Sequence, residues 1–79
     1  MKTLYFSSRG SSDPTGASIP LHLAANGSVA VGHETAVVLG GDATELLSQE
    51  TANAVEGVGV PPMRELLAKL RESGVPVYV

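Results

Sequence analysis

Three short apolar segments alternate with stretches of helical pattern along this chain. Residues 3–6 are apolar and rich in β-forming side chains. Residues 35–39 form a nearly continuous apolar run, which is typical of a strand covered on both faces of a parallel sheet. Residues 75–79 are the third predicted strand, and Pro76 is tolerable near its start because no ladder donor need be lost there. The pattern therefore predicts three strands.

The first connection predicts a helix that starts after a turn-rich loop. Asp13 is a favourable N-cap, and Pro14 suits the first helical turn. Pro20 leaves two alternatives, since either the helix starts near Ser18 or a longer helix bends at the proline. Gly32 is expected to end the helix in the left-handed conformation.

The second connection is longer and predicts more than one helix. Asp42 or Thr44 is expected to cap a short helix, residues 50–55 form another turn or two, and residues 56–60 form a loop. The clearest helix covers residues 63–73. Its apolar side chains recur at helical spacing and form one stripe: Met63, Leu66, Leu67 and Leu70.

The order β-α-β-α-β predicts an α/β fold with a parallel sheet, in one domain over residues 1–79. Right-handed crossovers restrict the topology. We expect the first strand in the centre (order 2-1-3) with helices on opposite faces, which is a doubly wound arrangement. Two free sheet edges and an excess of apolar surface on the first helix predict self-association, or a domain that is incomplete at its C-terminus.

Composition narrows the classes of partner and chemistry. The 79 residues are 43% hydrophobic and 16% charged, as in a folded protein, and the net charge is −3. The five Lys and Arg residues are spread along the chain, which argues against nucleic acid or an acidic membrane surface as a partner. With no cysteine, disulfides, thiolate nucleophiles and Cys-ligated zinc are excluded for these residues. Residues 14–33 lack a fixed charge but are interrupted by polar residues and proline, so we expect no membrane span and a cytoplasmic protein.

Candidate ligand-binding residues follow the first two predicted strands. They are Ser7, Arg9 and Asp13 in the first loop, and Gly41 and Asp42 in the second. Because the carboxyl ends of parallel strands share one edge of the sheet, we expect the two loops to lie together. Backbone N–H groups at a helix N-terminus suit an anion. The alternative is that the serines form a solvated turn and that both aspartates are helix caps.

No motif predicts a catalytic residue, a metal or a cofactor. The first loop contains neither the P-loop pattern nor the dinucleotide-binding glycine pattern, which disfavours a nucleotide-dependent enzyme, and no Gly-x-Ser-x-Gly motif is present. His22 is interpreted as a packed or interfacial helix residue and His33 as a helix-end residue. Two isolated histidines make a poor metal site.

Several segments resemble the DsrE/DsrF-like family. Residues 32–39 and 41–47, GHETAVVL and GDATELL, look like its second-strand segment. Residues 57–67 and 73–79, GVGVPPMRELL and SGVPVYV, are similar to its next helix and strand. The sequence Asp13-Pro14-Thr15 fits the start of its first helix. The resemblance spans nearly all of the chain.

This resemblance implies a three-layer, flavodoxin-like fold that assembles into dimers, trimers or hexamers. In sulfur-relay members of the DsrE and TusD types, a cysteine carries a persulfide and passes sulfur to a partner protein. In many members that cysteine follows the segment matching residues 74–79, and here it has no counterpart. We therefore expect either the amino-terminal part of a sulfur-relay protein without the family cysteine, or a non-catalytic homo-oligomeric module that binds a small ligand.

Overall fold

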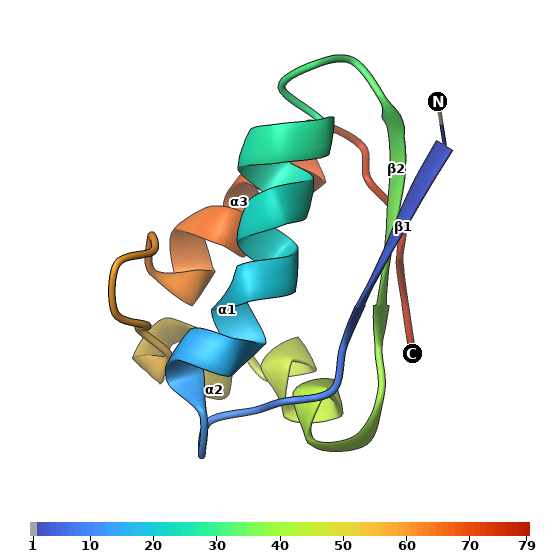
Figure 1. Ribbon diagram of the computed structural model, residues 1–79. Coiled ribbons are helices and arrows are strands. Elements are labelled where there is room, and N and C mark those ends of the chain that lie inside the picture. Colours follow the sequence, from blue (N-terminus) through green and yellow to red (C-terminus); the bar gives the residue numbers. More distant parts are fainter. Residues whose placement is uncertain (1) are drawn as a thin grey trace.

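Strands and helices alternate in the computed structural model, which describes residues 2–79 (Figure 1). A six-residue first strand is followed by an α-helix that continues into a π-helical turn, and the second connection contains a 3₁₀ helix and two α-helices. The elements are β1 (Lys2–Ser7), α1 (Pro14–Leu23), η1 (Ala24–Ser28), β2 (Glu34–Leu39), η2 (Gly41–Leu47), α2 (Gln49–Ala54), α3 (Met63–Glu72) and β3 (Val77–Tyr78).

The three strands form one parallel sheet in the order β1-β2-β3. The parallel α/β arrangement is confirmed, whereas the predicted order with the first strand in the centre is wrong. The central strand is β2, the most continuously apolar of the three, and it has hydrogen-bonded neighbours on both sides. Since both crossovers step across the sheet in the same direction, right-handed connections place both sets of helices on the same face.

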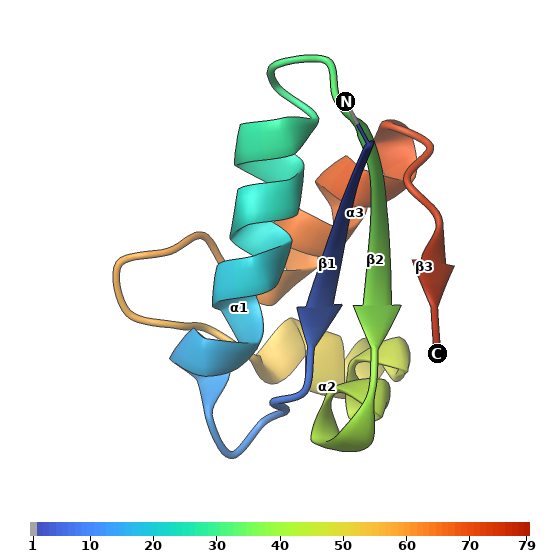
Figure 2. The same ribbon diagram turned by 45° about the vertical axis from the view of Figure 1, so that its right-hand side comes forward.

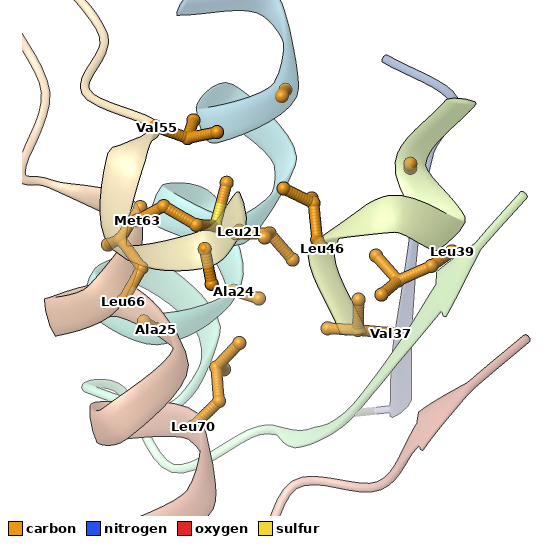
Figure 3. Close-up of a cluster of buried hydrophobic side chains, with 13 residues drawn as sticks. Leu21, Ala24, Ala25, Val37, Leu39, Leu46, Val55, Met63, Leu66 and Leu70 are labelled. Carbon is orange, nitrogen blue, oxygen red and sulfur yellow. The ribbon is translucent and has the colours of Figure 1, made fainter. Parts of the chain in front are cut away.

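All helices accordingly lie on one side of the sheet, as Figures 1 and 2 show. The described residues form two layers, and the expected doubly wound arrangement is not observed in them. Side chains alternate along each strand, so Val37 and Leu39 of β2 point toward the helices and are buried. They belong to one core cluster with buried apolar side chains of the helical layer, labelled in Figure 3: Leu21, Ala24, Ala25, Leu46, Val55, Met63, Leu66 and Leu70.

The opposite face of the sheet is apolar and has no layer over it within residues 2–79. Strand register aligns Phe6 of β1 with Val38 of β2 and Tyr78 of β3 in one row across the sheet. Leu4 lies beside Ala36 in the next row. Leu4, Phe6 and Tyr78 are 65%, 59% and 57% exposed. Parallel sheets are usually covered on both faces, so this open face is the most unusual feature of the fold.

The longer of the two alternatives for the first helix is confirmed. The helix begins at Pro14, continues through Pro20, and passes into the π-helical turn. The amide of Val29 donates to the carbonyl of Ala24 at 3.0 Å, and the amide of His33 donates to the carbonyl of Ser28 at 2.9 Å. Ile19 and Leu23 remain about half exposed, at 47% and 49%, which agrees with the predicted apolar excess on this helix.

The third strand is shorter than predicted. Helix α3 buries Met63, Leu66 and Leu70 of the predicted stripe, whereas Leu67 is only partly buried. The helix ends before Gly74, whose φ of 73° suits glycine. The amide of Val75 donates to the carbonyl of Leu70 at 3.0 Å, so this residue still belongs to the helix end. Regular pairing is therefore limited to Val77–Tyr78, although the carbonyl of Pro76 already accepts from Val37.

Candidate functional site

The loops after β1 and β2 lie together at the carboxyl edge of the sheet. The amide of Gly40 donates to the carbonyl of Ser7 at 3.0 Å, which joins the ends of the two strands. A side chain at Gly10 would meet the carbonyl oxygen of Asp42 at 2.5 Å, so the loops are in close contact. The geometry thus brings the five candidate residues to one edge, and the orientation of each side chain decides what they can bind.

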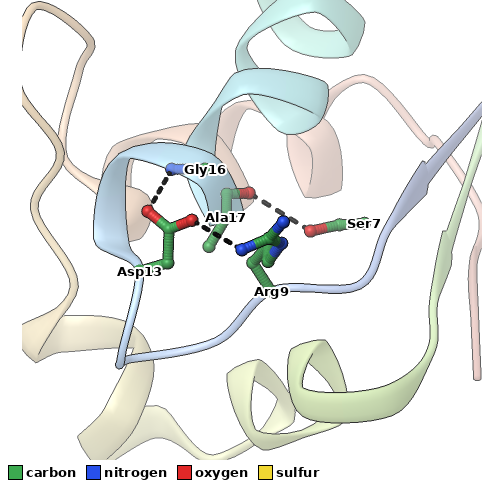
Figure 4. Close-up of polar contacts among 5 residues, drawn as sticks. All are labelled: Ser7, Arg9, Asp13, Gly16 and Ala17. Carbon is green, nitrogen blue, oxygen red and sulfur yellow. Dashed lines mark hydrogen bonds and ion pairs between the residues drawn. The ribbon is translucent and has the colours of Figure 1, made fainter.

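Ser7 does not offer its hydroxyl to a ligand. The residue is 1% exposed, and its Oγ donates to the carbonyl of Ala17 in α1 at 3.3 Å. This bond ties the end of β1 to the first turn of the helix (Figure 4). Ser7 is therefore a structural residue of the strand–helix junction.

Arg9 and Asp13 are paired with each other. One carboxylate oxygen of Asp13 accepts from the amide of Gly16 at 3.0 Å, and the other lies 3.2 Å from Nη1 of Arg9 (Figure 4). Asp13 is the N-cap of α1, which confirms the capping alternative for this aspartate. Because its negative charge stands at the positive end of the helix, this N-terminus is already neutralised.

Gly41 and Asp42 form the first turn of η2. Gly41 has a φ of 54°, in the left-handed region where glycine is favoured. The residue before it, Gly40, holds the N-cap position and has no side chain that could cap the helix, so the predicted capping by Asp42 or Thr44 is wrong. The Asp42 side chain is exposed to solvent beside the first loop.

Glu45 belongs to this edge and was missed by the sequence analysis. Its carboxylate accepts a hydrogen bond from the amide of Ser11, 34 residues away in the first loop. That backbone hydrogen bond, with a further one from the Ser11 side chain, lowers the pKa of Glu45 from its ordinary value of 4.5. No local motif marks Glu45, because its partner comes from a distant part of the chain.

The assembled edge is unsuitable for an anion. Three carboxylates, those of Asp13, Asp42 and Glu45, lie on the two loops with one guanidinium, that of Arg9. A phosphate would need free backbone amides as donors. The amide of Ser11 already donates to Glu45, and the amide of Gly16 at the helix N-terminus already donates to Asp13. Within residues 2–79 no group of three or more His, Cys, Asp or Glu side chains is placed to hold a metal ion.

The two histidines lie away from this edge. The ring nitrogen Nδ1 of His22 is 3.0 Å from the side-chain amide of Asn26, whose oxygen accepts from Lys69 at 2.5 Å. His33 lines a hollow of about 600 Å³ at the amino ends of the strands, together with Lys2 and Glu34. The hydroxyl of Thr3, on the wall of that hollow, is buried and has no hydrogen-bond partner among the described residues.

Among residues 2–79 no helix has both the length and the apolar character needed to cross a membrane. The comparisons with known proteins identify no relative: no family model, no curated protein and no solved structure matches this chain. The likeness to DsrE/DsrF-like proteins therefore rests on the sequence segments alone.

Proposed function

We propose that this chain is a non-catalytic, homo-oligomeric α/β module that binds a small ligand. The observation that carries the proposal is the open apolar face formed by Leu4, Phe6, Ala36, Val38 and Tyr78. Water contact with such a face is unfavourable in proportion to its apolar area. A second copy of the chain removes that contact by packing sheet against sheet.

The area of the open face fits a dimer. The exposed parts of Leu4, Phe6 and Tyr78 sum to on the order of 400 Å², given their exposed fractions and the usual size of such side chains. A standard interface buries about 800 Å² per partner, of which a little over half is apolar. The open face therefore supplies most of the apolar area that a stable dimer needs.

The charges of the face are compatible with self-association. Lys2 and Glu34 lie opposite each other at its amino end, with Nζ and Oε2 separated by 3.7 Å. Since this pair is neutral as a unit and stands at the margin, two copies meet through an uncharged centre. Sheets that pack face to face lie about 10 Å apart, with alternate side chains interleaved.

Sedimentation velocity over a broad dilution series tests the assembly. We expect the wild-type chain to sediment at twice its monomer mass of 8.1 kDa, and Leu4→Lys to sediment as a monomer. Val58→Lys is the matched control, because Val58 is 84% exposed in a loop of the helical layer and the charge change is identical. A wild-type monomer at the highest concentration would contradict the proposal, as would equal effects of the two variants.

Thermal-shift measurements test whether the loop edge is unsuitable for an anion. The carboxylates at the loop edge predict that inorganic phosphate and nucleotides do not stabilise the fold. A bound ligand at 100 times its dissociation constant stabilises a protein by about 2.7 kcal/mol, which is readily measured. Stabilisation by phosphate alone would show that this edge accepts an anion.

A DsrE-like sulfur-relay function, with a sulfur-relay protein as partner, is a second proposal. It is supported by the β-α-β-α-β order and the sequence segments described above. Tyr78 pairs with Val38, so a residue after Val79 would stand level with Gly40, near the loop edge. On this proposal further segments cover the open face and complete a three-layer, flavodoxin-like fold.

The gene beyond the Val79 codon distinguishes the two proposals. A cysteine codon within the next few positions favours sulfur transfer, because a persulfide carrier needs a thiol. An immediate stop codon contradicts the sulfur-relay proposal and favours the homo-oligomeric binding module.

A further inference from the structure

A second hollow, of about 420 Å³, lies on the helical side of the sheet beside β3. One wall is the outer stripe of α3, formed by Arg64, Leu67, Ala68 and Arg71 at helical spacing. The sheet contributes Leu39 and Val77 to the opposite wall. We call this hollow the α3 groove. It differs from the core stripe of α3, which is formed by Met63, Leu66 and Leu70.

The α3 groove is apolar inside and positively charged at its border. Leu46, Leu47 and Ala52 of η2 and α2 close it from the side, and Leu47 is 61% exposed. Two of the five cationic side chains of the chain line the groove, and no Asp or Glu of residues 2–79 does. The border of the groove is therefore positively charged, whereas the net charge of the protein is −3.

The two arginines differ in their availability. Nη1 of Arg64 lies 3.9 Å from a carboxylate oxygen of Glu56 and 3.5 Å from the carbonyl of Asn53, so this side chain has neighbours to hold it. Arg71 has no ion pair within residues 2–79. A guanidinium binds a carboxylate through two parallel hydrogen bonds, which gives both strength and orientation.

We propose that the α3 groove binds an amphipathic monocarboxylate, with its aliphatic chain along Leu47, Leu67 and Val77 and its carboxylate on Arg71. A volume of about 420 Å³ lies within the usual range of small-molecule sites, which combine apolar walls with a few polar groups. Arg64 assists by its charge from the other end of the stripe. This inference rests on the proposed ligand-binding role and names its ligand class.

Titration with decanoate, followed by amide and methyl NMR shifts, tests the assignment. We expect saturable binding with a dissociation constant below about 1 mM, and shifts centred on the leucines of the groove. Decanol, which keeps the chain and lacks the charge, should bind about tenfold more weakly. Decyltrimethylammonium, with the opposite charge, should not produce these shifts.

Variants on α3 separate charge from shape. Arg71→Gln should weaken decanoate binding about tenfold and Arg64→Gln by less, because Arg64 already has partners. Lys69→Gln is the matched control, with the same charge change on the same helix and a side chain that bonds Asn26 outside the groove. Ala68→Phe fills the groove, keeps both arginines, and should abolish binding.

Four outcomes overturn the inference: no saturable binding, shifts centred elsewhere, equal losses for Arg71→Gln and Lys69→Gln, or unchanged binding by Ala68→Phe. The result is independent of self-association, because the groove lies on the helical side of the sheet and the open apolar face on the other. A dimer that ignores decanoate contradicts only the groove, and a monomer that binds decanoate contradicts only the assembly.

Discussion

The hydroxyl oxygens of Tyr5 and Ser28 lie 2.5 Å apart and join the first strand to the π-helical turn, 23 residues further along the chain. Tyr5 is partly buried against the core, and Ser28 is 5% exposed. The contact fixes the distance between the sheet and the end of the long first helix.

Tyr5→Phe should lower the free energy of unfolding by about 1–2 kcal/mol, because the hydroxyl of Ser28 loses its partner in a buried position. For a chain of this size that corresponds to a fall in Tm of roughly 4–16 °C. Ser28→Ala supplies the control, because Tyr5→Phe should cost much less in a chain that already lacks the Ser28 hydroxyl. Equal costs of Tyr5→Phe in the two backgrounds, measured by urea unfolding, would show that the bond contributes nothing.

Three glycines should respond differently to substitution by alanine. At Gly10 a new Cβ would lie 2.5 Å from the backbone oxygen of Asp42, which cannot move independently of its loop. Gly10→Ala should therefore destabilise the fold by about 1–3 kcal/mol. At Gly40 the Cβ would lie 2.6 Å from Cζ of the exposed Phe6 ring, which can turn away, so the cost should stay below about 1 kcal/mol.

Gly27 completes the series. Nothing lies within 4 Å of a Cβ at this position, which is inside a helical turn. Gly27→Ala should raise the free energy of unfolding by up to about 1 kcal/mol, because alanine has the higher helix propensity and lowers the conformational entropy of the unfolded chain. Chemical denaturation of the three variants checks the order, and a Gly10→Ala variant as stable as wild type would contradict the close contact of the loops.

Asp13→Ala should cost about 1 kcal/mol, since the amide of Gly16 loses its acceptor at the N-terminus of α1. Asp13→Asn keeps the capping oxygen and removes the charge. We expect it to retain most of the stability, because the exposed pair with Arg9 contributes little. Equilibrium unfolding of both variants separates the cap from the ion pair, and similar losses in both would assign the effect to the charge.

The lowered pKa of Glu45 predicts a dependence of stability on pH. A carboxyl whose folded pKa is depressed adds stability above its unfolded value, here 4.5, and loses it as pH falls through the folded pKa. Glu45→Gln should therefore weaken stability near neutral pH and show a shallower loss on acidification below pH 4.5. Urea unfolding from neutral to acidic pH measures both slopes. Parallel curves for wild type and variant would contradict the role of Ser11.

Local patterns in the sequence were sufficient for the elements whose cause lies within a few residues. The stripe of Met63, Leu66 and Leu70 predicts α3, and the apolar run of residues 35–39 predicts the strand β2. Asp13 acts as an N-cap through a bond to Gly16, three residues away. Such interactions depend on backbone geometry over one helical turn or one strand, and residue type and spacing carry that information.

The strand order, the coverage of the sheet and the real partners at the loop edge required the tertiary structure. Nothing local distinguishes the order 2-1-3 from β1-β2-β3, because both use right-handed crossovers with the same elements. That choice alone puts every helix on one face and leaves Phe6 and Tyr78 uncovered. Likewise, Glu45 meets Ser11 across 34 residues, a contact that exists only once the two strands lie side by side.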